Sequence, residues 1–219
     1  MIVFDDTNLM TATGCSDSAA DSTDRFLLWI DGVGCYLLLD RRSVTLGGPT
    51  AVATDISLLA NLSRRHAEIV RDDSGHVLVA HGTVHVDDRL VADRINLSHG
   101  NTIRLGASVE LVFGRPTALS ATASLEFASD HRPALSVDGL VLVEQTCLLG
   151  PGADCHVHCP EWPDTVLLIR RDRQWFTRSV LPLEIDGRPA RGETPLDDGG
   201  TVTGETFRFR IESWTPDTC

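Results

Sequence analysis

The chain has 219 residues, of which 42% are hydrophobic and 23% are charged. This ordinary globular composition excludes wholesale disorder, a collagen-like fibre and a disulfide-dense mini-protein. The 19 Lys and Arg residues against 31 Asp and Glu give a formal net charge of −12. Such a charge repels a phosphate backbone except at a local cluster of arginines, so we expect no general nucleic-acid binding. The sequence has no lysine, and every fixed cation is therefore a guanidinium, which suits forked contacts with phosphate or carboxylate.

Residues 1–24 differ from the rest of the chain. From Asp5 to Asp24 there are five aspartates and no cation, mostly among Ser, Thr, Ala and Gly. Such a segment cannot bury enough apolar area to offset its ordering entropy, so we expect a flexible acidic tail. No stretch reaches the roughly 20 apolar residues of a membrane helix, and acidic residues stand where a secretory signal needs basic ones. The expected location is the cytoplasm, with no membrane partner.

The cysteines favour the same location. They follow no framework spacing, and two of them lie near the chain ends, as is typical of reduced thiols in a cytosol. The six are Cys15, Cys35, Cys147, Cys155, Cys159 and Cys219. We therefore expect no structural disulfide.

From Arg25 onward, short apolar runs alternate with turn sequences. Phe26–Ile30 and Cys35–Leu39 flank an Asp-Gly-Val-Gly turn, which is typical of a β-hairpin. Val109–Phe113 and similar runs alternate apolar and polar residues with period two, the pattern of a half-buried sheet. No window of about a dozen residues has the periodicity of an amphipathic helix, and the closest, Asp55–Leu62, is too short. The sequence predicts an all-β chain, a sandwich or a barrel.

The second half of the chain repeats motifs of the first half. Val86–Arg89 matches Ile185–Arg188, and Leu97–Ile103 matches Leu196–Val202, both 99 residues apart. A repeat of this length is about a domain. We expect two tandem β-sandwiches, the second degenerate, with a Gly- and Pro-containing linker between them. The expected regions are a tail at 1–24, domains at 25–113 and 123–213, a linker at 114–122 and a C-terminal tail at 214–219.

Four blocks of sequence resemble the forkhead-associated (FHA) domain in order and spacing. They are Thr45-Leu-Gly47, Leu62-Ser-Arg-Arg-His-Ala-Glu-Ile69, Val86-Asp-Asp-Arg89 and the stretch from Leu97 to Gly106. The resemblance covers Phe26 to Phe113 well and the second repeat faintly. It implies an FHA/SMAD-like β-sandwich that binds phosphothreonine peptides through loops at one end, without catalysis or a cofactor.

The whole chain also resembles two-part FHA proteins of planctomycete-type bacteria. The resemblance lies in Leu28-Trp-Ile-Asp-Gly-Val-Gly34, Leu148-Leu-Gly-Pro-Gly152 and Cys159-Pro-Glu-Trp-Pro163. It implies a protein partner in bacterial Ser/Thr kinase signalling. The sequence leaves the oligomeric state open.

The resemblance assigns the phosphate contacts to Ser63 and Arg64, and assigns His66 to bracing their loop from inside. A phosphate with a charge near −2 needs hydroxyl, backbone and guanidinium donors that converge. Two of the family's ligands are absent, because its arginine falls at Gly48 and its asparagine at His81 or Gly82. Each lost charge-assisted hydrogen bond removes about 1.5–3 kcal/mol, so we expect weak phosphopeptide binding unless another donor compensates. The arginines considered for that role are Arg41, Arg42 and Arg65.

Two motifs suggest metal binding or catalysis. Cys155-His-Val-His-Cys159 holds four zinc-ligand side chains, but in a strand its cysteines lie about 13 Å apart and cannot close one tetrahedron. Ser63 and His66 are three residues apart, but in a loop entering a strand we expect their side chains to diverge, so we predict no enzyme. We expect no metal. The alternatives to phosphothreonine recognition are a phosphate-independent scaffold with the same fold and a zinc-stabilised binding protein.

Overall fold

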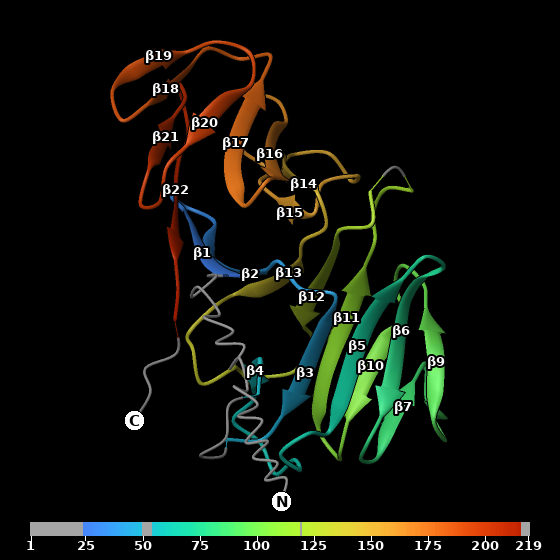
Figure 1. The fold of residues 1–219 in the computed structure, drawn as a ribbon. Helices are drawn as coiled ribbons and strands as arrows, with labels where there is room; N and C mark the ends of the chain where they lie inside the picture. Colours follow the sequence, from blue (N-terminus) through green and yellow to red (C-terminus); the bar gives the residue numbers. More distant parts are fainter. Residues whose placement is uncertain (1–23, 50–53, 119, 216–219) are drawn as a thin grey trace, which may run out of the picture.

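The computed structural model describes residues 24–49, 54–118 and 120–215, and within these ranges it contains strands and no helix (Figure 1). The expected all-β fold is confirmed. Both predicted tails lie largely outside the described residues. The strands are β1 (Arg25–Ile30), β2 (Gly34–Leu39), β3 (Ser43–Gly47), β4 (Ile56–Ser57), β5 (Ala67–Asp72), β6 (Gly75–Ala80), β7 (Val84–Val86), β8 (Arg89–Leu90), β9 (Arg94–Leu97), β10 (Thr102–Leu105), β11 (Val109–Gly114), β12 (Ala123–Phe127), β13 (Gly139–Leu142), β14 (Thr146–Gly150), β15 (Val157–His158), β16 (Val166–Arg171), β17 (Gln174–Ser179), β18 (Leu183–Ile185), β19 (Arg188–Ala190), β20 (Thr194–Leu196), β21 (Thr201–Thr203) and β22 (Arg208–Ser213).

The strands form two equivalent sets, β1–β11 and β12–β22. One five-stranded sheet has the order β4-β3-β5-β6-β9, and the other has the order β15-β14-β16-β17-β20, which is the same order shifted by eleven strands. The remaining strands form one twelve-stranded sheet, β19-β18-β21-β22-β1-β2-β13-β12-β11-β10-β7-β8. Its order is unchanged when each strand is replaced by its equivalent and the sheet is read backwards, so the two repeats are related by a pseudo-twofold axis.

The first hairpin of each repeat pairs with the other repeat. Strand β1 pairs antiparallel with β22, the last strand of the second repeat, and β12 pairs with β11, the last strand of the first. Strands β2 and β13 then meet as parallel neighbours at the middle of the sheet. The strands of the first set lie within 25–114 and those of the second within 123–213, and the hairpin exchange pairs strands of one range with strands of the other.

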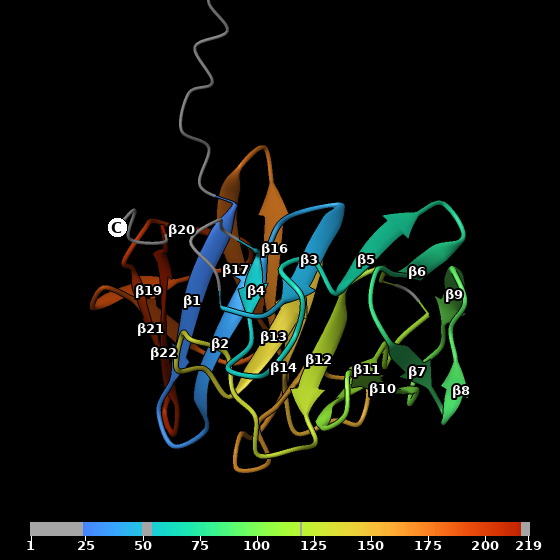
Figure 2. The ribbon, with the colours of Figure 1, turned by 90° about the horizontal axis from the view of Figure 1, so that it is seen from below.

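The exchanged hairpins are largely buried on both faces, with Trp29 of β1 and Glu126 of β12 as exposed exceptions. Figure 2 shows β1, β2, β13 and β12 side by side in the middle of the molecule. Leu37 and Leu39 point into the core beneath the first five-stranded sheet, whereas Leu28 and Leu38 point into the core beneath the second. Burial on both faces explains why β1, β2 and β13 are mostly continuous apolar runs instead of alternating ones.

The tight turns of the repeated motifs need left-handed backbone, and Asp and Gly supply it. Asp87 and Asp88 have φ of 48° and 62°, and the matching Asp186 and Gly187 have φ of 50° and 76°. The Asp186 carboxylate accepts the Thr201 N–H at 3.0 Å, as that of Asp87 accepts the Thr102 N–H at 2.9 Å. These aspartates therefore form turns and join neighbouring strands.

Two findings concern membrane spans and disulfides. Within the described part of the chain, no helix is long and apolar enough to span a bilayer. The four cysteines that the structure describes are buried free thiols: Cys35, Cys147, Cys155 and Cys159.

Candidate functional site

Ser63 and Arg64 lie on the loop between β4 and β5, where three connections of the first repeat converge. The Ser63 carbonyl accepts the N–H of Gly48, from the β3–β4 connection, at 3.0 Å. The His66 carbonyl accepts the N–H groups of His81 and Gly82, from the β6–β7 connection, at 3.0 and 2.8 Å. The backbone thus binds the three loops together at the lower end of this sandwich in Figure 1.

The imidazole of His66 ties two of these loops together from inside. The residue is 6% exposed, and its Nε2 lies 3.0 Å from the Thr83 carbonyl oxygen. Its Nδ1 accepts the Ser63 N–H at 3.3 Å, so the ring proton is on Nε2 and is donated to Thr83. Loop position and ring tautomer are therefore set by the same residue.

The Ser63 hydroxyl is engaged within its own loop. Its Oγ donates to the Arg65 carbonyl oxygen at 3.2 Å and also lies 3.1 Å from Nδ1 of His66, a second acceptor for the same proton. Our expectation that the Ser63 and His66 side chains diverge is wrong, because residues 63–66 fold back as a turn before β5 begins. The hydroxyl must release the Arg65 carbonyl before it can donate its proton to a phosphate. In its present orientation its lone pairs would repel a phosphate oxygen.

The loop between β4 and β5 holds two arginines. Arg64 is exposed and has no ion pair among the described residues. Arg65 is paired with Glu68, which also accepts hydrogen bonds from Ser43 and His81. Burial by itself would raise the pKa of Glu68, but these hydrogen bonds hold it below its ordinary value. The carboxylate therefore keeps Arg65 and His81 turned away from a ligand.

Neither of the other two arginines proposed as compensating donors reaches the site. Arg41 is paired with Asp24 and Asp55, and Arg42 precedes β3, whereas the candidate loops follow its far end. A strand of five residues separates the two ends by roughly 16 Å. Both arginines consequently belong to the opposite end of the strand.

Two of the positions where the FHA resemblance leaves a ligand missing, Gly48 and Gly82, are sterically closed, whereas the alternative position, His81, has its side chain paired with Glu68. A Cβ atom at Gly48 would lie 2.4 Å from the carbonyl oxygen of Leu62, which is backbone and cannot move aside freely. A Cβ atom at Gly82 would lie 2.4 Å from Cε1 of the His66 ring. With this packing, no ligand-bearing side chain fits at either position. The close approach of the loops therefore explains why these two positions hold glycine.

The equivalent loop of the second repeat has an apolar plug. Trp162, in the β15–β16 connection, is 5% exposed and stacks on Phe207 with 4.2 Å between ring centroids. In the preceding segment, Nδ1 of His156 accepts the Leu148 N–H at 3.0 Å, and burial raises the pKa of the Cys159 thiol to about 12. No group of three metal-ligating side chains gathers anywhere in the described ranges. The side chains of this loop are therefore buried in the core of the second sandwich.

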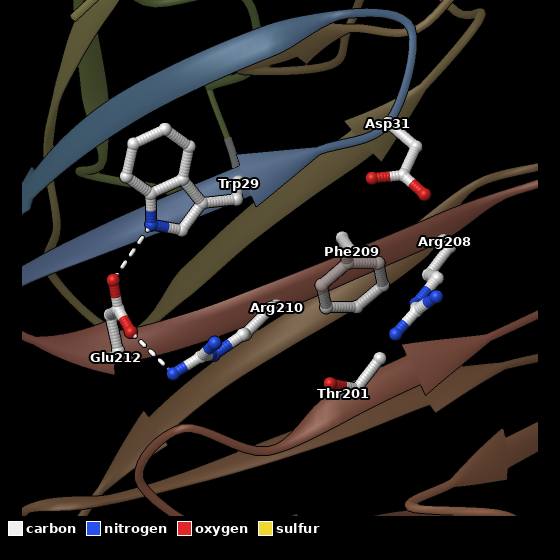
Figure 3. Close-up of a pocket in the computed structure, with 7 residues that line it drawn as sticks. All are labelled: Trp29, Asp31, Thr201, Arg208, Phe209, Arg210 and Glu212. Carbon is white, nitrogen blue, oxygen red and sulfur yellow. Dashed lines mark hydrogen bonds and ion pairs between the residues drawn. The ribbon is translucent and has the colours of Figure 1, made fainter. Parts of the chain in front are cut away.

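A second polar surface lies on the open face of the twelve-stranded sheet, around the exposed side chain of Trp29. The indole of Trp29 is 44% exposed and donates from Nε1 to Glu212 at 2.9 Å. Arg210 pairs with the same carboxylate at 2.6 Å. Figure 3 shows them around a shallow pocket of about 380 Å³ on β1, β21 and β22. A tryptophan inside the continuous apolar run 26–30 carries no sequence signal that it faces outward.

Comparison with known proteins assigns no function, so the function is argued from the groups at the loop end. No protein-family model matches the chain, and the comparison with curated proteins finds no match. The loop end around Ser63 offers an exposed guanidinium, a hydroxyl and a rigid backbone braced by His66. This arrangement suits capture of an anionic group at a surface.

Proposed function

We propose that this protein is a non-enzymatic, FHA-type interaction module that binds a phosphothreonine-containing protein partner through the loop end holding Ser63 and Arg64. The setting that fits it is bacterial Ser/Thr kinase signalling in the cytoplasm. The observation that carries the proposal is the convergence of three hydrogen-bonded loops on an exposed Arg64 beside the Ser63 hydroxyl. The four sequence blocks that resemble the family support it.

Electrostatics make binding at such a site depend on the local arginines. The protein as a whole carries −12 and repels anions, so capture depends on the field of the local arginines. One free guanidinium supplies about 1.5–3 kcal/mol through a charge-assisted hydrogen bond. Binding should therefore be weak and should weaken further as salt rises, because exposed charges are screened.

A phosphate-independent scaffold is the second candidate, and one observation favours it. The Ser63 hydroxyl already donates to the Arg65 carbonyl, and Gly48 and Gly82 leave no room for further ligands. In this alternative the same loop surface binds a partner through shape and backbone groups. The two candidates differ in whether binding requires the phosphate.

The test compares a degenerate phosphothreonine peptide library with its unphosphorylated twin on the full chain. We expect the phosphorylated library to be retained, and retention to fall at least five-fold in the Ser63→Ala, Arg64→Gln double variant. Arg89→Gln is the matched control, because Arg89 is exposed at the far end of β7 from this loop. Equal retention of both libraries would establish the scaffold instead.

A further inference from the structure

The loop between β12 and β13, residues 128–138, has no counterpart of similar length in the other repeat. The equivalent connection between β1 and β2 is the short turn 31–33. Because the hairpins are exchanged, the long loop belongs to the second repeat in sequence but lies on the first sandwich. Long loops in compact domains commonly carry function.

This loop lies against the connection that holds the candidate site. The N–H of Leu59 donates to the Arg132 carbonyl at 3.0 Å, and the N–H of Ala134 donates to the Ser57 carbonyl at 2.7 Å. Leu58 and Pro133 form a β-bridge between these two bonds. Figures 1 and 2 both show the segment beside β4. The long loop is therefore part of the same end of the sandwich as Ser63.

Arg132 is held in place and is free of acid partners. Its Nη1 donates to the carbonyls of Ser129 and His131 at 2.6 and 3.0 Å, and its guanidinium lies 5.4 Å from the centroid of the Phe127 ring. The residue is exposed, and no carboxylate among the described residues pairs with it. A guanidinium fixed by Nη1 alone keeps Nε and Nη2 as donors for an external acceptor.

Building on the proposed function, we infer that Arg132 is the second cation of the recognition surface, supplied by the second repeat, and that it selects an acidic side chain flanking the phosphothreonine. Leu59, which is bonded to Arg132, precedes Ser63 by four residues, a span of at most about 14 Å. An extended peptide advances about 3.3 Å per residue. The backbone at Leu59 thus lies within about four extended peptide positions of Ser63, and four positions on either side of the phosphothreonine are the range to test.

The hairpin exchange gives this inference its physical basis. Gly48 cannot carry a guanidinium, because a Cβ atom there would meet the Leu62 backbone. The loop 128–138 belongs to the other repeat and places the Arg132 guanidinium at the same end of the sandwich, so no side chain is needed at Gly48. The second sandwich has only the turn 31–33 and buried Trp162 at the corresponding place, so the arrangement occurs once.

The experiment measures affinity for a set of phosphothreonine peptides in which one aspartate is moved through the four positions on either side. We expect one position to strengthen binding about five-fold, which is the upper range for an exposed ion pair. Arg132→Gln should abolish that gain, Arg132→Lys should keep part of it, and the Arg89→Gln control should keep all of it. Thermal unfolding of Arg132→Gln should match the native protein.

Each contrary result has a definite meaning. A gain that persists in Arg132→Gln, or no gain at any position, would overturn the role of Arg132 while phosphate-dependent binding still upholds the proposed function. A loss in both Arg132→Gln and Arg132→Lys, accompanied by a lower melting temperature, would show that Arg132 only holds its own loop. Equal affinity for phosphorylated and unphosphorylated parent peptides would overturn the proposed function and this inference together.

Discussion

Nε of Arg170 donates to the Asp40 carboxylate at 2.9 Å, although the two residues are 130 positions apart in the chain. Arg71, the equivalent of Arg170 in the first repeat, donates to the Val143 carbonyl at 2.7 Å. Asp40 directly follows β2, and Val143 directly follows β13. In each sandwich, an arginine of the five-stranded sheet therefore binds the residue that directly follows the hairpin of the other repeat.

Removing Arg170 should destabilise the protein. Its side chain is 6% exposed and lies over the rings of Phe26 and Trp175, at 4.6 and 5.1 Å from their centroids. Arg170→Leu leaves the Asp40 carboxylate without its partner, and we expect a loss of about 3 kcal/mol in the free energy of unfolding. Urea denaturation measures it. Arg188→Leu, at an exposed strand edge, is the control, and an equal effect there would contradict the role of the buried pair.

Adjacent residues of β2 should couple the two cores. Leu38 is in the second core and Leu39 in the first, and both are fully buried. Each change to alanine should cost about 2–5 kcal/mol. Because β2 is shared, we expect a single unfolding transition in calorimetry for the native protein and for both variants. Two resolved transitions in Leu38→Ala would mean that the sandwiches unfold independently despite the exchange.

Stability should fall on mild acidification. Burial, with the charges of Arg71 and Arg115, lowers the pKa of His76 to about 4, and burial lowers that of His156 to about 4. Both rings stay neutral in the folded chain but take up a proton in the unfolded chain below about pH 6.5. The unfolded state thus binds more protons between pH 6.5 and 4, and the free energy of unfolding decreases as pH falls through that window.

The variant His76→Phe tests this origin of the pH dependence. It replaces a ring that packs against Phe113, whose centroid lies 5.2 Å away, and removes one of the two titrating groups. Denaturation midpoints measured from pH 7 to pH 4 should then fall less steeply. His158→Gln, at an exposed position, should leave the slope as it is. An unchanged slope in His76→Phe would assign the effect to other groups.

Introducing the arginine that the FHA resemblance leads one to expect after Gly47 should fail. Gly48→Arg places a Cβ atom against the Leu62 carbonyl, so we expect a lower melting temperature and no gain in phosphopeptide affinity. Gly82→Asn should likewise displace the His66 ring and loosen the loop. Differential scanning fluorimetry and peptide titration measure the two effects. A stable Gly48→Arg variant with tighter binding would show that the loops can separate.

Sequence patterns are sufficient for the local structure of this protein. Period-two alternation in Val109–Phe113 and the Asp-rich turns at 87–88 and 186–187 predict strands and hairpins, because side-chain direction and left-handed backbone are properties of a few consecutive residues. The 99-residue offset likewise predicts two equivalent sets of strands. The continuous apolar run at Phe26–Ile30 indicates a strand, but not what covers each of its faces.

Only the tertiary structure decides which repeat each hairpin joins. Strands β1 and β12 are equivalent strands of the two repeats, and strand propensity does not specify a pairing partner, so it does not distinguish the exchanged from the unexchanged pairing. Burial of both faces, one in each core, selects between them. The same long-range packing closes Gly48, exposes Trp29 and brings Arg132 beside the Ser63 loop, because contacts between residues far apart in the chain depend on how whole sheets stack and not on neighbouring residues.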